Sequence, residues 1–124
     1  MCGIAGVFLR RPEAEPALLA RAAAMGRTLA HRGPDGAGEW ADAEAGIAFA
    51  HRRLAIIDLS PGGAQPMASS CGRYVVTYNG ELYNYRALRD ELASRGRPAQ
   101  GESDTAVLLE AVAQWGVADA LPRL

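Results

Sequence analysis

The order of apolar patterns along the chain predicts strands that follow one another as a group, with helices before and after them. Residues 2–9 form a continuous run of apolar and small residues, which is typical of a buried strand. A helical pattern comes next, then several short strand patterns, and then two more helical patterns. Strands grouped in this way, without a helix between each pair, indicate an α+β fold.

Three segments show the three- and four-residue spacing of apolar side chains that indicates an amphipathic helix. The first covers residues 16–30, after Pro12 ends the opening strand. The second covers residues 85–95, with Asn84 as its expected N-cap, Leu88 and Leu92 facing inward, and Gly96 at its end. The third covers residues 104–115 with Ser103 as N-cap. Its expected apolar stripe is Val107, Leu108, Ala111, Val112 and Trp115.

Short strand patterns fill the middle of the chain. Residues 37–42 and 45–51 read as two strands joined by a polar turn, and residues 53–58 and 73–79 as two more. Glycine and proline predict a turn at residues 31–36 and a loop at residues 60–66. The pair Asn79-Gly80 is a strong turn signal that ends the last strand.

The length and charge of the chain exclude several classes of protein. Its 124 residues suffice for one domain. A net charge of −1 gives no strong field to attract nucleic acid or anionic lipid. No apolar run approaches the roughly 20 residues of a membrane helix.

The ends of the chain and its two cysteines give two more expectations. Cys2 and Cys71 are too few for a disulfide framework, so a reducing, cytoplasmic location is favoured over a secreted, disulfide-linked domain. The chain stops at residues 121–124 without a polar tail, which suggests a fragment of a longer protein.

Cys2 is the first candidate for chemistry. Removal of the initiator Met would put its thiol and a free α-amine on one residue. Amines and thiols of these kinds ordinarily titrate near about 8, which suits a base and a nucleophile that work near neutral pH. An N-terminal nucleophile that uses its own amine as base is a known activation scheme. The alternative is a small buried residue at the head of a strand.

A series of short motifs accompanies this cysteine in a fixed order. They are Cys2-Gly3-Ile4-Ala5-Gly6, His31-Arg32-Gly33-Pro34-Asp35-Gly36, His51-Arg52-Arg53-Leu54-Ala55-Ile56-Ile57-Asp58, Gln65-Pro66-Met67, Tyr78-Asn79-Gly80-Glu81-Leu82-Tyr83-Asn84-Tyr85 and Ser103-Asp104-Thr105. Together they resemble the class II glutamine amidotransferase domain, the N-terminal-nucleophile glutaminase. Pro34 and the His-Arg-Arg-Leu run are most similar to the asparagine synthase (glutamine-hydrolysing) branch. The resemblance extends from Met1 to about Trp115.

The resemblance implies a role for each matched residue. Cys2 matches the nucleophile, with its α-amine as base. Asn79 matches an oxyanion donor through its side-chain amide, and Gly80 a second donor through its backbone N–H. Arg53 matches the residue that binds the glutamine α-carboxylate, for which a guanidinium fork is well suited. Two acidic residues match contacts of the α-ammonium: Asp104 as the main one and Glu81 as a second.

Each of these residues also has a purely structural interpretation. Asn79-Gly80 forms a hairpin turn equally well, and the two interpretations are compatible. Asp104 in the first turn of a helix favours the helix dipole by about 0.3–1 kcal/mol. Arg52 would point to the opposite face of a strand from Arg53, so it is the weaker candidate for the clamp.

The remaining candidates are interpreted as structural. We expect His31 and His51 to play no catalytic part, and two histidines without spaced partners make no metal site. Gly33 and Gly36 are expected to serve backbone geometry. Cys71, in a turn between strands, is expected to be incidental.

The resemblance also shows what the chain lacks. Family members continue with further strands that complete an αββα sandwich, so residues 1–124 are expected to form an N-terminal-nucleophile fold that is incomplete at its C-terminus. The synthetase domain that would use ammonia, with ATP and Mg²⁺, is absent, and no Gly-rich phosphate loop of the Walker type occurs.

These observations predict a glutaminase that releases glutamate and ammonia from L-glutamine. In the full-length enzyme the ammonia would form asparagine from aspartate, in a synthetase domain of the same chain; a homodimer is left open. Two alternatives remain: a truncated, non-catalytic fragment, and an amidotransferase half that serves a sugar-acid or peptide acceptor.

Overall fold

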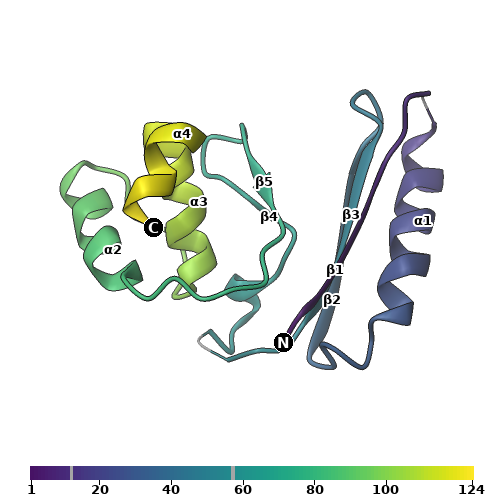
Figure 1. Ribbon diagram of the computed structural model, residues 1–124, viewed down its shortest axis with the longest axis horizontal. Helices are drawn as coiled ribbons and strands as arrows, with labels where there is room; N and C mark the ends of the chain where they lie inside the picture. Colours follow the sequence, from purple (N-terminus) through teal and green to yellow (C-terminus); the bar gives the residue numbers. More distant parts are fainter. Residues whose placement is uncertain (12, 57) are drawn as a thin grey trace. The chain divides into compact units, whose positions relative to one another are not determined.

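Helices and antiparallel strands make up the chain, as the grouped strand patterns predict (Figure 1). A computed structural model describes residues 1–11, 13–56 and 58–124. The chain divides into two compact units. The first contains Met1–Ala55, Ala64–Pro66 and Thr77–Asn79, and the second contains Ile56–Gly63, Met67–Val76 and Gly80–Leu124. Each unit is described by itself below.

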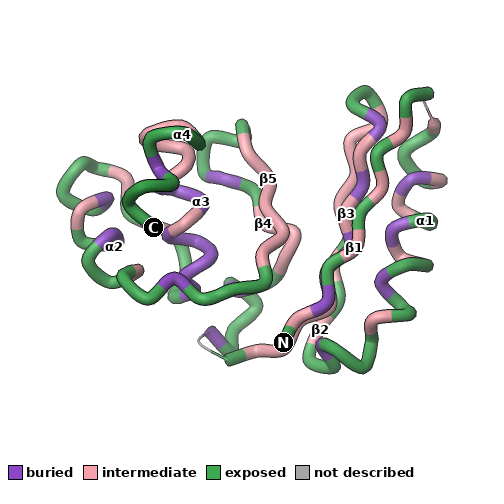
Figure 2. Tube along the Cα trace, in the orientation of Figure 1, coloured by how far each residue is buried: buried purple, intermediate pink, exposed green. Residues whose placement is uncertain are grey.

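The first unit is a three-stranded antiparallel sheet with one helix against it. The strands β1 (Gly3–Phe8), β2 (Gly36–Asp42) and β3 (Ile47–Arg53) lie in the order β1-β3-β2. Helix α1 (Glu15–Thr28) packs on one face of this sheet, where Leu18 and Ala22 meet Ala48 and Ala50. Figure 2 shows the buried residues of α1 on the side that faces the sheet. Alanines and Gly26 keep the helix close, because a Cβ at Gly26 would already lie 3.1 Å from the Cβ of Ala50.

The other face of the same sheet carries two short segments from later in the chain. Successive side chains of a strand alternate between faces, so Phe49 and His51 lie opposite the face that Ala48 and Ala50 present to α1. His51 contacts Thr77 here, with 2.9 Å between Nδ1 and Oγ1. Gln65 bridges the two segments, because its side-chain oxygen accepts a 2.6 Å hydrogen bond from the backbone N–H of Tyr78.

The second unit is mostly helical. Its main helices are α2 (Tyr85–Ser94) and α3 (Asp104–Trp115), followed by the short α4 (Val117–Ala120). A two-stranded ribbon, β4 (Met67–Ala68) with β5 (Val75–Val76), and two 3₁₀ turns, η1 (Pro61–Gly63) and η2 (Leu121–Arg123), complete it. The core is formed by Leu82, Leu88, Leu92, Val107 and Ala111, with Leu108 and Trp115 packed against it.

Helix ends follow the sequence signals, with one exception. The Ser103 hydroxyl accepts a 3.1 Å hydrogen bond from the N–H of Ala106, so the expected cap of α3 is confirmed. Gly96, at φ 74°, ends α2 as expected. Asn84 occupies the N-cap position of α2, but its side chain makes no cap hydrogen bond. Its Nδ2 instead donates to the backbone oxygen of Arg123 at 2.7 Å.

The expected strand over residues 53–58 is wrong. Arg53 is the last residue of β3, and no strand continues over Leu54, Ala55 or Ile56. The physical reason is that side chains take the backbone donors that a strand partner would need: Leu54 N–H donates to the Cys2 sulfur and Ala55 N–H to Asp35. Ile57 lies outside the described residues. Pro12, which was expected to end the first strand, lies outside them too.

The strand expected over residues 73–79 is much shorter than the pattern suggests. Only Val75–Val76 pair, with β4. Side chains again accept hydrogen bonds from the flanking backbone N–H groups. The Ser69 hydroxyl accepts from Tyr74 N–H, and the Gln65 side-chain oxygen accepts from Tyr78 N–H. The partner β4 has two residues and the terminal α4 has four, too few to give a periodic signal.

Candidate active site

The thiol of Cys2 lies half-buried at the start of β1. Its sulfur accepts a hydrogen bond of 3.3 Å from the backbone N–H of Leu54 and lies 3.7 Å from the Leu54 carbonyl oxygen. Gly3 pairs with Arg52 across β1 and β3, so Cys2 lies level with the end of β3. The register of β1 and β3 thus places Cys2 next to Leu54, which follows it by about fifty positions in the sequence.

Arg53 ends β3 beside this thiol. Its backbone oxygen accepts a 3.0 Å hydrogen bond from Asp35 N–H, which ties the turn before β2 to the strand end. Alternation places Arg53 on the face that carries His51, and Cys2 on the same face as Ile4. Arg52 therefore belongs to the α1 face, as expected of the weaker candidate. The structure brings Cys2 and Arg53 together on one face of the sheet.

Asn79 belongs to the same unit as these two residues. It is exposed, and it ends the segment Thr77–Asn79 that lies on the sheet. The two residues before it are fixed by side chains: Thr77 by His51 and Tyr78 by Gln65. Gln65 and Thr77 gave no functional signal in the sequence beyond the Gln-Pro-Met motif itself.

Gly80, Glu81 and Asp104 lie in the second unit. Asp104 is the first residue of α3 and only 6% exposed. Its Oδ2 accepts a 2.9 Å hydrogen bond from Leu82 N–H, and its Oδ1 one of 2.8 Å from Thr105 N–H. Gly80 and Glu81 are exposed and directly precede Leu82, so Asp104 anchors the segment that carries them. The last of the chain's crossings between the two units falls between Asn79 and Gly80.

The two histidines occupy different environments. His31 is exposed, whereas His51 is only 1% exposed. Burial lowers the pKa of His51 below its ordinary value, and the charge of nearby Arg53 lowers it further. The imidazole is therefore neutral at physiological pH. Within the described residues, its Nε2 has no hydrogen-bond partner.

The two turn glycines also differ. A Cβ at Gly33 would lie 2.3 Å from the Arg52 backbone, so a close approach requires glycine there. At Gly36 the nearest atom would be 3.6 Å away, in ordinary contact, and no positive φ occurs at this position. The expected geometric need is confirmed for Gly33 and wrong for Gly36.

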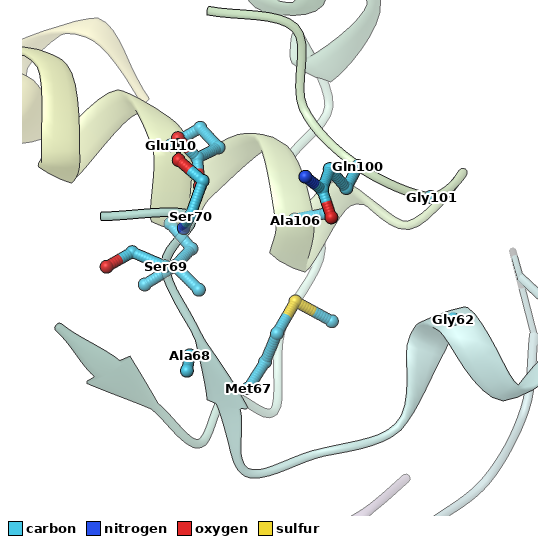
Figure 3. A pocket seen from close by; sticks show the side chains of 10 residues that line it. Gly62, Met67, Ala68, Ser69, Ser70, Gln100, Gly101, Ala106 and Glu110 are labelled. Atoms are coloured by element: carbon cyan, nitrogen blue, oxygen red, sulfur yellow. Dashed lines mark hydrogen bonds between the residues drawn. The ribbon is translucent and has the colours of Figure 1, made fainter. Parts of the chain in front are cut away.

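A cavity of about 500 Å³ in the second unit contains none of the expected site residues. Figure 3 shows Glu110 and Ser70 on one side of it and Gln100 on the other. The buried Glu110 carboxylate accepts hydrogen bonds from Ser70 N–H at 2.7 Å and from the Ser70 hydroxyl at 2.8 Å. This pair joins residues forty positions apart, and no sequence signal pointed to it.

Comparison with known proteins decides the family. The model of the glutamine amidotransferase domain matches residues 1–124. The chain belongs to the glutamine amidotransferase family. The resemblance inferred from the ordered motifs is thereby confirmed, and with it the mixed fold of helices and antiparallel strands.

Several curated proteins are similar to this amidotransferase chain. Asparagine synthetase [glutamine-hydrolyzing] 1 of Bacillus subtilis (strain 168) is 43% identical over 113 residues, which is 88% of this chain and 17% of that protein. Asparagine synthetase B [glutamine-hydrolyzing] of Escherichia coli (strain K12) is 40% identical over 109 residues, 88% of this chain and 19% of that protein. Amidase chry2 of Gibberella zeae is 37% identical over 89 residues, 72% of this chain and 13% of that protein. The amidotransferase chain thus spans less than a fifth of the length of these relatives.

Among residues 1–11, 13–56 and 58–124, no helix is long and apolar enough to cross a membrane. Within the same residues, no three His, Cys, Asp or Glu side chains gather closely enough to hold a metal ion.

Proposed function

We propose that this amidotransferase chain hydrolyses L-glutamine to glutamate and ammonia, with Cys2 as the N-terminal nucleophile once Met1 has been removed. The observation that carries the proposal is the position of the Cys2 sulfur at the Leu54 N–H, on the same sheet face as Arg53. A thiol and an arginine on one face of a sheet suit a substrate whose reacting carbonyl and α-carboxylate belong to one small molecule. Met1 is 70% exposed, so an aminopeptidase can reach it.

The proposed chemistry has two steps. The Cys2 thiolate attacks the side-chain carbonyl carbon of glutamine, and the oxyanion that forms accepts hydrogen bonds from the Asn79 amide and the Gly80 N–H. The C–N bond then breaks, and ammonia leaves with a proton carried by the α-amine of Cys2. Water attacks the resulting thioester, which releases glutamate and regenerates the thiol.

Three charged residues matched by the family resemblance would hold the amino-acid end of glutamine. Arg53 would bind the α-carboxylate through two parallel N–H bonds. Asp104 and Glu81 would bind the α-ammonium. Asp104 accepts hydrogen bonds from two backbone N–H groups, which fix the position of its carboxyl group.

The wider protein and its acceptor are a further part of the proposal. The names of the bacterial relatives support the formation of asparagine, for which the acceptor would be aspartate. ATP and Mg²⁺ would activate the acceptor in a synthetase domain outside this sequence. The exposed Phe8 and Ile4, on the sheet face away from α1, suit the second sheet of an αββα sandwich. The free thiols Cys2 and Cys71 fit a reducing cytoplasm.

Intact mass spectrometry of the protein that carries this sequence tests the nucleophile. The sample is treated with diazo-oxo-norleucine, a glutamine analogue that alkylates a glutaminase nucleophile. We expect loss of Met1 and one adduct on Cys2, together with ammonia release from glutamine in the untreated sample. Ammonia release that persists in Cys2→Ala would contradict the proposal.

Cys71 requires its own control in this experiment. It is exposed, and the hydrogen bond from the Ser69 side chain, 3.4 Å away, lowers the pKa of its thiol. An electrophile could therefore also label Cys71. The Cys71→Ser variant should retain both the adduct and the activity, and an adduct lost only in this variant would move the label away from Cys2.

A further inference from the structure

We propose that His51 and Thr77 form a positioning pair that sets where the Asn79 amide lies relative to Arg53. The inference rests on the proposed glutaminase function, and it adds two residues with no direct contact to the substrate. Both lie in the first unit, His51 two residues before Arg53 and Thr77 two residues before Asn79.

The burial of His51 is the first argument. An imidazole that is 1% exposed with an unpartnered Nε2 is unfavourable compared with an apolar side chain of similar size. Its one hydrogen bond within the described residues is the 2.9 Å contact with Thr77. We infer that the contribution of His51 at this buried position is its hydrogen bond to the distant segment that contains Thr77.

The segment Thr77–Asn79 is the second argument. It contacts the sheet through His51, and it belongs to no strand formed by the residues that the structure describes. Side chains hold it instead, His51 at Thr77 and Gln65 at Tyr78. Asn79 follows directly and is exposed. These two side-chain contacts therefore help to set its position.

Arg53 supplies the third argument. Residues two apart on a strand project from the same face, so His51 and Arg53 both lie on the side that carries Thr77. A single rigid strand thus holds the α-carboxylate clamp and the anchor of the oxyanion donor. Burial and the Arg53 charge both lower the pKa of His51, which keeps the ring neutral beside the guanidinium.

An oxyanion donor stabilises the transition state more than the bound ground state. The His51–Thr77 pair should therefore affect kcat more than KM. Loss of one such donor lowers kcat by about 10²–10³-fold. Displacement of the donor should have a smaller effect than its loss, a decrease in kcat of roughly 10-fold. KM should stay within about 2-fold of its wild-type value, because the contacts that bind the ground-state substrate are unchanged.

Variants of Thr77 give the sharpest test, because valine keeps its shape and serine keeps its hydroxyl. In the protein that carries this sequence, Thr77→Val should lower kcat for glutaminase activity and Thr77→Ser should stay near wild type. His51→Leu should lower kcat to a similar extent, and the double variant should be little worse than either single variant, because both remove one bond. Wild-type kcat in Thr77→Val, a rise in KM alone, or multiplying effects in the double variant would each overturn the inference.

A readout without turnover separates positioning from general damage. The side-chain amide resonances of Asn79 in a ¹⁵N–¹H NMR spectrum should shift or broaden in Thr77→Val and remain in place in Thr77→Ser. Unmoved Asn79 resonances in a folded Thr77→Val protein would also overturn the inference. Glutaminase activity that survives Cys2→Ala would instead contradict the proposed function, whatever the Thr77 variants do.

Discussion

On the sheet face away from α1, the size of a single residue determines how closely another segment can approach. At Gly38 of β2, a Cβ would lie 2.2 Å from the backbone oxygen of Gln65. No side chain fits in that space, so the segment Ala64–Pro66 can lie against the sheet only over glycine. The same segment supplies the Gln65 oxygen that holds Tyr78 N–H, one residue before Asn79.

Gly38→Ala should therefore push this segment off the sheet. We expect a loss of about 1–3 kcal/mol in the free energy of unfolding, typical of overpacking. Glutaminase activity should also fall, because Asn79 shifts with Tyr78. The matched control is Gly36→Ala on the same strand, where a Cβ would meet only ordinary contacts at 3.6 Å. Denaturant unfolding and ammonia release measure both variants, and equal effects at the two positions would contradict this account.

His51 gives the stability a pH dependence whose sign follows from its pKa. Burial and Arg53 lower the pKa in the folded protein, so the unfolded chain binds a proton more readily. The stabilising effect is complete above the ordinary histidine pKa of about 6.5, and it is lost as pH falls through the lower folded value. His51→Gln should flatten this part of the curve. Urea unfolding between about pH 7 and pH 5 measures it, and parallel wild-type and variant curves would contradict the prediction.

Helices and strands differ in how far their residues alone determine them. The spacing of apolar side chains and the Ser103 cap give α3 with its observed bounds, because both signals lie within the helix. The strand ends depend on distant side chains: Cys2 and Asp35 take the donors that would extend β3 past Arg53. No local pattern contains that information, so the strand expected over residues 53–58 could not be excluded from sequence.

The two N-cap positions allow a direct comparison at this scale. Ser103→Ala removes a bonded cap, so it should lower the free energy of unfolding by about 1 kcal/mol. Asn84→Ala removes no cap bond, only the contact with the Arg123 carbonyl near the chain end. It should therefore have a smaller effect. Thermal or denaturant unfolding compares the pair, and a larger loss in Asn84→Ala would be inconsistent with the observed caps.

Residues of the candidate site could be proposed one by one from the sequence, but their arrangement could not. The ordered motifs identified the family, and Cys2 and Arg53 do lie on one face of the sheet. The contacts that hold the segment before Asn79 were missed, because His51 and Thr77 are twenty-six positions apart and no local pattern pairs them. The roles of all six matched residues remain predictions to be tested by substitution.

At the scale of the whole molecule, each unit has its own hydrophobic core. Leu18 and Ala22 pack with β3 in one, and Leu88, Leu92 and Val107 pack together in the other. The two clusters share no residue among those described. Each unit can therefore lose stability through its own core.

Leu92→Ala should thus act locally. Truncation of this fully buried side chain should lower stability by about 2–5 kcal/mol. Hydrogen exchange followed by mass spectrometry should show faster exchange in α2 and α3, with little change in α1 and the three-stranded sheet. Leu18→Ala is the matched variant with the reverse pattern. Equal acceleration in both units for either variant would contradict separate cores.

The path of the chain between the units has a practical consequence. The backbone passes from one unit to the other after Ala55, Gly63, Pro66, Val76 and Asn79. No single cut can therefore release either unit as a continuous piece. A cut after Asn79, for example, would leave Ile56–Gly63 and Met67–Val76 of the second unit on the fragment that carries the first unit. Dissecting this molecule into smaller working parts thus requires rejoining chain ends, not trimming them.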